Sequence, residues 1–260
     1  MTRLLSAAAL VSIIVGVIWF LPSAVTVVLA GVFLLLAFVE YARLARSAGV
    51  VFNAVPSGAA TVATAASVGL APGALPLVAM TGGLVIALTA LAEKRRDGAL
   101  AAVGAAGFAL LYLGLPLGAL VAVFLESGRE TLLLLLATIA ASDTAQYYGG
   151  RTMGRRPLAP VVSPKKTVEG ALCGVVAGAG AFAVVGAWWM PALPPAQRVA
   201  FGATLALVGI AGDLFESHLK RASGLKDASG LIPGHGGVLD RIDAMLFAAP
   251  VYYGLVMGAG

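Results

Sequence analysis

The strongest constraint on this chain is a series of apolar segments, each about as long as a bilayer is thick. A helix needs roughly 20 mostly apolar residues to cross the hydrocarbon core of a membrane. Hydrophobic residues make up 60% of the 260-residue chain, and its mean hydropathy is +0.98, which excludes an ordinary soluble domain. We therefore predict an all-α polytopic integral membrane protein with about nine transmembrane helices. The segments lie at residues 4–21, 23–39, 55–71, 74–92, 99–125, 131–149, 170–190, 198–215 and 242–259.

The basic residues are divided unequally between the two sides that these segments define. With the N-terminus inside, all of the 17 Lys and Arg residues except Arg129 and Arg198 fall on the inner side. Because inner loops of membrane proteins are enriched in Lys and Arg, we predict a multi-pass protein of a bacterial-type inner (plasma) membrane. Its N-terminus and active site would be cytoplasmic and its C-terminus outside. The net charge of +5 suits anionic lipids of the bilayer and anionic substrates. Nucleic acid is a poor partner, since no soluble binding module accompanies the basic residues.

We predict a single membrane domain over residues 1–260 with two unequal parts. Residues 1–125 carry few polar groups inside their segments and are expected to form a helical scaffold, with a kink or tilt near Pro116. Glu40 and Glu93 lie at inner segment ends, where carboxylates are usually solvated, although from there they could reach a cytoplasmic site. Residues 126–260 form the expected catalytic half, with cytoplasmic loops at residues 150–169 and 217–241.

The second of these loops concentrates the charge of an otherwise apolar chain. Charged residues are only 11% of the sequence, yet seven of them and both histidines lie between Ser217 and Asp243. Pro233 and the neighbouring glycines forbid a continuous helix there. Such a loop can turn backbone N–H groups and cations toward a polyanion, while carboxylates beside them hold a divalent metal. We predict a metal-assisted phosphate site. The alternative is a solvated loop with ordinary membrane-flanking cations.

Acidic residues approach this loop from both sides. Asp213, Glu216 and Lys220 are spaced to share one face of the helix that leads into the loop. Asp240 and Asp243, three residues apart, share a face where the last segment begins. Their hard oxygen ligands suit Mg²⁺, whereas two histidines and one cysteine are too few and too scattered for zinc.

A further carboxylate lies inside the sixth apolar segment. Asp143 would cost about 2.5–3.5 kcal/mol at the centre of a membrane helix, so it is expected to face a wet cavity, a cation or a partner. The alternative is a structural ion pair with Arg151. After this segment, prolines break the helix, and hydroxyl and ammonium groups suited to phosphate follow. These groups belong to Ser163, Lys165, Lys166 and Thr167.

Small residues four apart mark the seventh segment. Gly170, Gly174 and Gly178 form a ridge that lets another helix approach closely. We expect this ridge to serve packing, either within one chain or between subunits.

The order of residues in the two loops is specific. The later loop reads Ser217, Lys220-Arg221, Lys226-Asp227, Ser229, Ile232-Pro233, His235-Gly236-Gly237 and Asp240-Arg241-x-Asp243. It resembles, without a mismatch, the signature of the phosphatidate cytidylyltransferase (CDP-diacylglycerol synthase) family. The earlier block resembles a second pattern of that family and departs from it at Gln146, which is usually aromatic, and at Cys173, which is often glycine. That block reads Asp143, Gly150-Arg151, Gly154, Ser163-Pro164, Lys166-Thr167 and Glu169-Gly170.

The resemblance implies transfer of a cytidylyl group from CTP to phosphatidate, giving CDP-diacylglycerol and pyrophosphate for phospholipid biosynthesis. It implies Mg²⁺, with room for a second cation, and leaves a homodimer open. A CTP-dependent polyprenol or phytol kinase and, further off, a membrane transporter are the alternatives. On this basis we expect catalytic roles for Asp240, Asp213, Lys220, Arg241 and His235, and metal ligands at Asp213, Asp240, Asp243 and Asp143. Substrate contacts are expected at Ser163, Lys166, Thr167, Glu169, Arg221, Lys226, Asp227, Gly236 and Gly237, whereas His218 is expected on a loop or helix surface.

Overall fold

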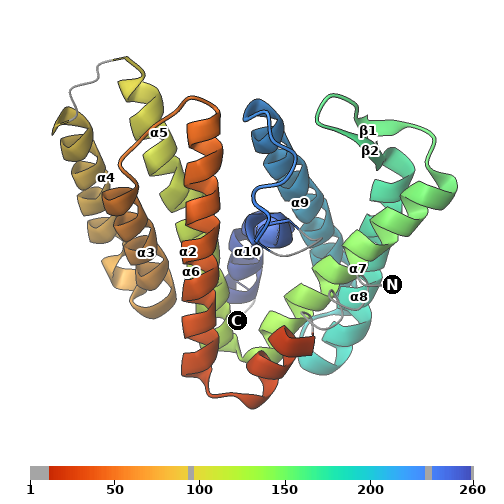
Figure 1. The fold of residues 1–260 in the computed structure, drawn as a ribbon. Helices are drawn as coiled ribbons and strands as arrows, with labels where there is room; N and C mark the ends of the chain where they lie inside the picture. Colours follow the sequence, from red (N-terminus) through yellow and green to blue (C-terminus); the bar gives the residue numbers. More distant parts are fainter. Residues whose placement is uncertain (1–11, 93–96, 232–235, 259–260) are drawn as a thin grey trace.

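The protein is a bundle of helices (Figure 1). The structure, a computed structural model, describes residues 12–92, 97–231 and 236–258. A short helical stretch at residues 12–20 precedes the labelled elements. The helices are α2 (Ser23–Ser47), α3 (Ala54–Leu70), α4 (Leu75–Ala92), α5 (Ala99–Ala109), α6 (Leu115–Ser127), α7 (Arg129–Met153), α8 (Val168–Trp189), α9 (Pro195–Ala222) and α10 (Leu239–Gly258), with a 3₁₀ turn η1 at Pro72–Ala74 and a π-helical turn η2 at Leu110–Gly114.

Every predicted segment from the second onward coincides with one of these helical regions, and the first begins outside the described residues and is helical at residues 12–20. Within the described part, five helical stretches are long and apolar enough to cross a membrane. These observations support an integral membrane protein. The five stretches are Ser23–Ser47, Pro72–Ala92, Ala99–Ser127, Val168–Trp189 and Pro195–Ala222, and Ala54–Leu70 is a shorter apolar helix.

The helices fall into three groups. Figure 1 shows α3, α4 and α5 on one side, α7 and α8 on the other, and α2, α6, α9 and α10 between them. α10 packs on both α6 and α9 and so joins the two halves of the chain. The central core contains side chains from α2, η2 and α10, including Leu34, Leu113 and Leu246. Near Pro116, where an irregularity was expected, the helix has the π-helical turn η2, a local adjustment that suits a proline without its own N–H.

The ridge on α8 packs within the chain. A Cβ at Gly170 would lie 2.8 Å from the carbonyl oxygen of Gln146 on α7, and one at Gly178 would lie 2.8 Å from Ala206 Cβ on α9. The small residues therefore let the backbones of α7, α8 and α9 approach closely.

The protein is mostly helical, as predicted, and the loop between α7 and α8 adds one short element that was not predicted. This loop contains an antiparallel hairpin, β1 (Pro157–Ala159) and β2 (Ser163–Thr167), with Pro157 opposite Thr167 and Ala159 opposite Ser163. Proline excludes a regular helix here, and pairing two short strands satisfies backbone groups that would otherwise need water.

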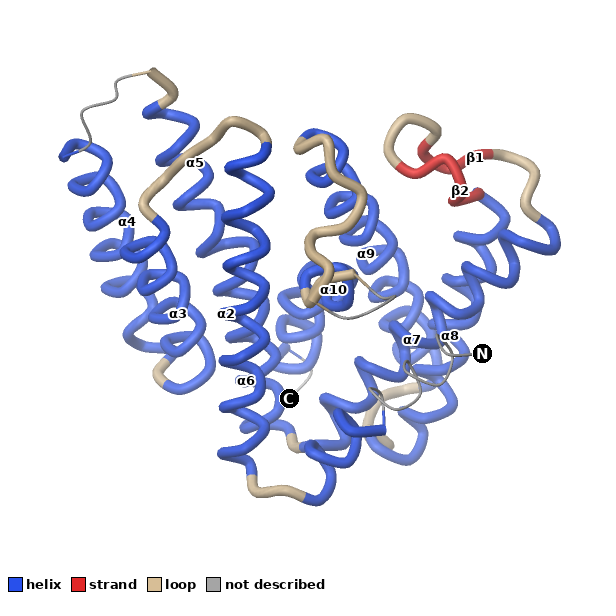
Figure 2. Tube along the Cα trace, viewed as in Figure 1, coloured by secondary structure: helices blue, strands red, loops and turns tan. Residues whose placement is uncertain are grey.

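The second predicted loop is shorter than expected. α9 continues to Ala222, so the segment from Ser217 is helical at first, and the connection to α10 covers residues 223–238. We call this connection the α9–α10 loop. Gly224 ends the helix with a φ of +69°, a conformation that glycine adopts without steric cost. From the tip of α9 the loop descends to the middle of the molecule, where α10 begins (Figure 2).

Close packing between α8 and α9 predicts a sharp difference between two glycines. In Gly202→Ala the new Cβ would lie 2.6 Å from Phe182 Cβ and 2.7 Å from the Gly178 carbonyl oxygen. Overpacking of this kind costs about 1–3 kcal/mol, so the thermal unfolding temperature in detergent should fall. Gly180→Ala is the matched control, because no neighbouring atom lies within 4 Å of its Cβ position. Equal unfolding temperatures for the two variants would contradict the packing assigned here.

Candidate active site

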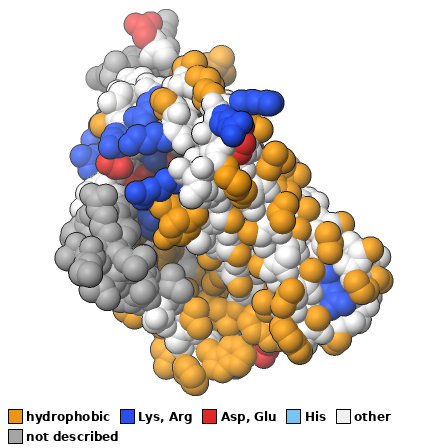
Figure 3. Space-filling model, turned by 90° about the vertical axis from the view of Figure 1, so that its right-hand side faces the viewer, with side chains coloured by type: hydrophobic (Ala, Val, Ile, Leu, Met, Phe, Trp, Pro, Cys, Tyr) orange, Lys and Arg blue, Asp and Glu red, His pale blue; other side chains and the backbone are white. Residues whose placement is uncertain are grey.

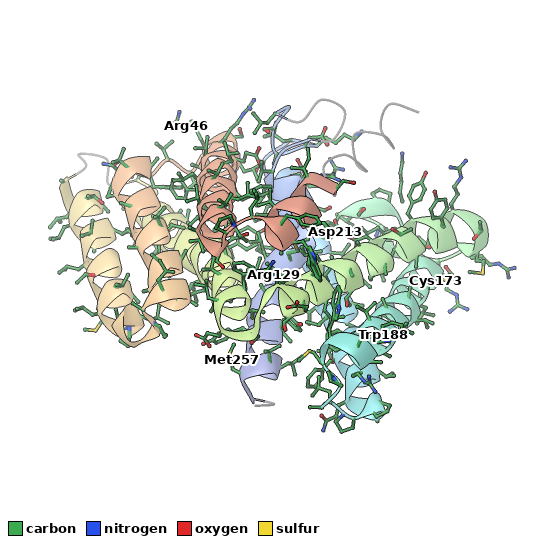
Figure 4. The ribbon with its side chains drawn as sticks, turned by 90° about the horizontal axis from the view of Figure 1, so that it is seen from below. Arg46, Arg129, Cys173, Trp188, Asp213 and Met257 are labelled. Carbon is green, nitrogen blue, oxygen red and sulfur yellow. The ribbon has the colours of Figure 1, made fainter. Side chains whose placement is uncertain are left out.

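A cavity of about 680 Å³ opens between α7, β2, α8, α9 and the start of α10. It brings together nine of the residues singled out from the sequence, although they lie on elements far apart in the chain. Figure 4 shows one of them, Asp213, near the centre of the molecule. The nine are Asp143, Lys166, Thr167, Asp213, Lys220, Asp227, Asp240, Arg241 and Asp243, and the cavity is also lined by Gln146, Tyr147, Gly150, Arg151, Lys165, Gly170 and Ala171.

One cation joins the two helices on either side of the α9–α10 loop. Lys220 Nζ forms a salt bridge with Glu216, one turn earlier on α9, and another with Asp240 Oδ1 at 2.5 Å. The side chain of Glu216 is fully buried, and those of Lys220 and Asp240 are only 12% and 6% exposed. Its two carboxylate partners offset the charge of Lys220, so in this arrangement it ties α9 to α10 rather than standing free for a phosphate.

Asp240 also ties an inner part of the α9–α10 loop to the end of that loop. Its Oδ2 accepts hydrogen bonds from the backbone N–H of Ala228 at 3.0 Å and of Gly237 at 2.7 Å. Gly236 has a φ of +78°, and a Cβ there would lie 2.6 Å from Asp240 Oδ2. The glycines thus let the backbone wrap around this carboxylate. The Gly237 N–H, which the sequence suggested for the triphosphate, is engaged by Asp240.

A second carboxylate in the loop comes from α2, far away in sequence. Glu40 is 4% exposed. Its Oε1 accepts from Ser229 Oγ at 2.6 Å and from Val238 N at 3.0 Å, and its Oε2 accepts from Leu239 N at 2.7 Å. The expectation that this residue is solvated is therefore wrong. Glu93, its counterpart in the sequence argument, lies outside the described residues.

The hairpin reaches the cavity through Lys166, which forms a salt bridge with Asp213 on α9. Thr167 also lines the cavity, and its hydroxyl accepts from Gly170 N at 3.1 Å, which caps the start of α8. Lys165 and Thr167 flank Lys166 on the same wall. This wall therefore offers two ammonium groups and a hydroxyl.

The other predicted residues do not line the cavity as described, and two of them, Glu169 and Arg221, stabilise the hairpin and the end of α9. Glu169 accepts from the backbone N–H groups of Arg155 at 2.9 Å and Arg156 at 3.1 Å, just before β1. Arg221 donates to the carbonyl oxygens of Val162 at 3.4 Å and Leu225 at 3.2 Å, and so links the hairpin to the end of α9. The remaining ones are Ser163, which begins β2, the exposed Lys226, and Gly236 and Gly237 in the α9–α10 loop.

The carboxylate of Asp143 opens onto the cavity from α7. Gln146 Nε2 donates to Asp143 Oδ1 at 3.1 Å, and Arg151 donates to the Tyr147 hydroxyl at 3.3 Å. Among the described side chains no salt bridge joins Asp143 to Arg151, so the structural ion pair considered from the sequence is not formed.

The donor set has the character of a site for a hard cation. Asp143, Asp213 and Asp243 line the cavity from three different helices. α9 and α10 pack closely there: a Cβ at Gly212 of α9 would lie 2.6 Å from the carbonyl oxygen of Asp243 on α10. In the part of the chain that the structure describes, no three His, Cys, Asp or Glu residues are grouped to hold an ion alone. A Mg²⁺ ion commonly takes only one or two protein carboxylates and completes its shell with waters and substrate phosphates.

The two histidines differ in what can be said of them. His218 is exposed on α9, as predicted for a helix-surface residue. His235, expected to act as a donor, lies outside the described residues.

Comparison with known proteins gives this cavity a context. A sequence profile described as "Cytidylyltransferase family" matches residues 1–257. The chain belongs to this family. Among curated members named phosphatidate cytidylyltransferase, that of Helicobacter pylori (strain ATCC 700392 / 26695) is 44% identical over 141 residues, 54% of this chain and 52% of the relative. That of Aquifex aeolicus is 43% identical over 137 residues, 52% and 50%. That of Brucella suis is 34% identical over 224 residues, 83% and 78%.

The chain thus spans about half the length of the first curated relatives that it matches, and more than three quarters of the one from Brucella suis. The family match covers both halves of the chain. It therefore includes α2 with Glu40 as well as the helices that surround the cavity.

The bridge at Lys220 predicts a large loss of stability when its cation is removed. Lys220→Met leaves the buried carboxylates of Glu216 and Asp240 without a cation, and breaking a buried ion pair in this way costs about 3–5 kcal/mol. Thermal unfolding of the purified protein measures the effect. Lys226→Met is the matched control, because Lys226 is exposed and surface substitutions usually change stability by about 0.5 kcal/mol or less. Similar unfolding temperatures for both variants would contradict a structural role for Lys220.

Proposed function

We propose that this chain is a phosphatidate cytidylyltransferase, which transfers a cytidylyl group from CTP to phosphatidate and releases pyrophosphate in phospholipid biosynthesis. The observation that carries the proposal is the cavity in which Lys166 of the hairpin pairs with Asp213, and which carboxylates from α7, α9 and α10 line. Family membership adds the nucleotidyl-transfer chemistry, and curated relatives carry this name.

We further propose that about nine helices cross the membrane, with the cavity on the cytoplasmic side and the N-terminus inside. The distribution of charge supports this orientation. The described basic residues gather at the end where α2 and α9 finish and the hairpin lies, and apolar side chains dominate below them on the face in Figure 3. Arg129 and Arg198 begin α7 and α9 at the other end. One domain with a scaffold half and a catalytic half, and a homodimer, stay predictions.

The basic groups on the cavity wall would bind the phosphates of both substrates. Lys165 and Lys166 act as mobile point charges, whereas Arg151 and Arg241 suit bidentate contacts with phosphate oxygens. Thr167 would add a hydroxyl, and Asp227 would orient a neighbouring cation. The outer contacts proposed from the sequence are Ser163, Glu169, Arg221, Lys226, Gly236 and Gly237, with His235 as a donor to phosphate or leaving group.

The acidic groups fit a bound Mg²⁺, with room for a second cation. Asp213 and Asp243 are the first candidates because α9 and α10 touch beside them, and Asp143 faces the same space from α7. Asp240 would contribute only lone pairs that Lys220 and the loop N–H groups leave open. When bound, the ion would offset negative charge on the triphosphate.

The proposed reaction is a direct displacement. An oxygen of the phosphatidate phosphate forms a bond to the α-phosphorus of CTP, and the bond from that phosphorus to the bridging oxygen of the β-phosphate breaks. The electron pair leaves with pyrophosphate. A phosphomonoester is already anionic at neutral pH and needs no general base to attack. The protein therefore contributes chiefly orientation of the two substrates and neutralisation of their charge.

Turnover by the purified full chain in detergent tests the reaction class. With CTP, phosphatidate and Mg²⁺ we expect CDP-diacylglycerol and pyrophosphate in equal amounts, measured by lipid chromatography and a coupled pyrophosphate assay. Offering a polyprenol or phytol instead separates the kinase alternative, which would release CDP and phosphorylate the alcohol. No product from any of these lipids would contradict the proposal and reopen transport.

The carboxylates assigned to the ion predict a second result. Asp213→Asn should lower turnover about 100-fold or more, the usual order for losing one preorganised electrostatic group. The unfolding temperature reports whether the variant is folded. Glu126→Gln, an exposed carboxylate at the end of α6, is the matched control and should leave turnover unchanged. Near-normal turnover in Asp213→Asn would remove this residue from the site.

Removal of divalent cations gives an independent check on the same assignment. Chelation with EDTA should abolish turnover of the wild-type chain, and added Mg²⁺ should restore it, since the carboxylates alone leave the triphosphate charge uncompensated. Full activity after exhaustive chelation would contradict the proposed cation.

A further inference from the structure

We propose that Glu40 of α2 is a positioning residue for the cytidylyl transfer, because it fixes the point at which α10 enters the cavity. The inference rests on the proposed function for its catalytic consequence, but the geometry that carries it does not. It assigns a role in the site to the N-terminal half of the chain, for which the sequence predicts chiefly a helical scaffold.

Glu40 uses both carboxylate oxygens on one short stretch of backbone. Oε1 accepts from Val238 N at 3.0 Å and Oε2 from Leu239 N at 2.7 Å, 198 and 199 residues along the chain. Oε1 also accepts from Ser229 Oγ at 2.6 Å, and that hydroxyl in turn accepts from Leu231 N at 3.1 Å. One side chain thus contacts both the descending part of the α9–α10 loop and its end.

The position of this carboxylate is the one that an anion takes at a helix start. The first N–H groups of a helix lack partners within the helix and carry partial positive charge. At the start of α10, Glu40 accepts from Val238 N and Leu239 N, and Asp240 accepts from Gly237 N just before the helix, so these donors are not open to a phosphate. Substrate phosphates are therefore directed away from the start of α10, toward the basic groups on the hairpin side of the cavity.

The backbone at Gly237 lies so close to Glu40 that it leaves no room for a larger residue. Gly237 is buried, and a Cβ there would lie 2.6 Å from Glu40 Cδ. Leu239 is fully buried in the core that joins α2 to α10. The glycine and the glutamate are therefore complementary in shape, so a change at one should alter the cost of a change at the other.

The next residues of α10 connect this contact to the chemistry. Asp240 directly follows Leu239, and Asp243 lies about one turn further on the same face, so both carboxylates move with the first turn of α10. A shift of the reacting groups by about 1 Å can cost about 100-fold in rate. Glu40 itself does not line the cavity as described. It acts through Asp240 and Asp243.

A double-mutant cycle on the full chain in detergent tests the proposal. Glu40→Gln places an NH₂ group against backbone donors and should lower kcat about 100-fold. The KM for CTP should change far less, because the hairpin cations remain. Glu40→Ala and Gly237→Ala should each lower kcat, but together they should lower it no further than the larger single loss, since truncation of Glu40 makes room for the new Cβ. Glu126→Gln is again the control.

Hydrogen exchange of the α9–α10 loop gives a readout that does not require activity. In Glu40→Gln, exchange should rise in residues 228–239 and stay unchanged in α7 and α8. Multiplicative losses in the cycle, or a loss of kcat accompanied by uniform exchange and a general fall in stability, would overturn the proposal. If the wild-type chain has no turnover, the proposed function fails, while the exchange pattern still decides whether Glu40 holds the loop.

Discussion

The structure around the cavity depends on how the buried charges of Glu216, Lys220 and Asp240 are paired where α9 connects to α10. Lys220 lies between Glu216 and Asp240, and Asp240 accepts from the backbone N–H groups of Ala228 within the loop and Gly237 near its end. Buried charges are expensive unless they are paired and hydrogen-bonded. Each of these groups therefore constrains the next, and the chain path from α9 to α10 follows from satisfying them.

The same constraint explains why the site is built from distant segments. The hairpin between α7 and α8 supplies a cation to Asp213 on α9, and α2 supplies a carboxylate to the start of α10. The close approach of α7, α8 and α9 through small residues brings these groups within reach. The site therefore depends both on close packing of the helices and on pairing of the polar groups that this packing brings together.

Much of the fold could be predicted from the sequence, because the length of an apolar run is a local property that membrane thickness dictates. The two loops that contain glycine and proline could also be predicted as sites, because the order of residues within each loop is specific. The hairpin could not, because Ser163–Thr167 lacks an alternating apolar pattern and pairs only with a three-residue strand. The sequence predicts too early an end for α9, because its charged residues suggest a loop although they are compatible with the last turns of a helix.

The role of Glu40 was hidden for a different reason. Its partners are almost 200 residues away, and they are mainly backbone N–H groups, which carry no sequence signature. A carboxylate at the end of an apolar helix looks the same in sequence whether it faces water or a buried loop. Lys220 shows the reverse case. Its place in the motif was evident, but its partners, and so its structural role, depend on a contact across the loop.

The hairpin has a mechanical consequence. Both of its ends continue into helices, and those helices approach so closely at Gly149, Gly150 and Gly170 that they leave little space for sliding. Glu169 and Thr167 clamp its base to the start of α8. We therefore expect the hairpin and the α7–α8 pair to form one rigid unit. A change in the width of the cavity on this side would involve the hairpin and both helices together, so side chains on the outer surface of the α7–α8 pair would influence the position of the hairpin.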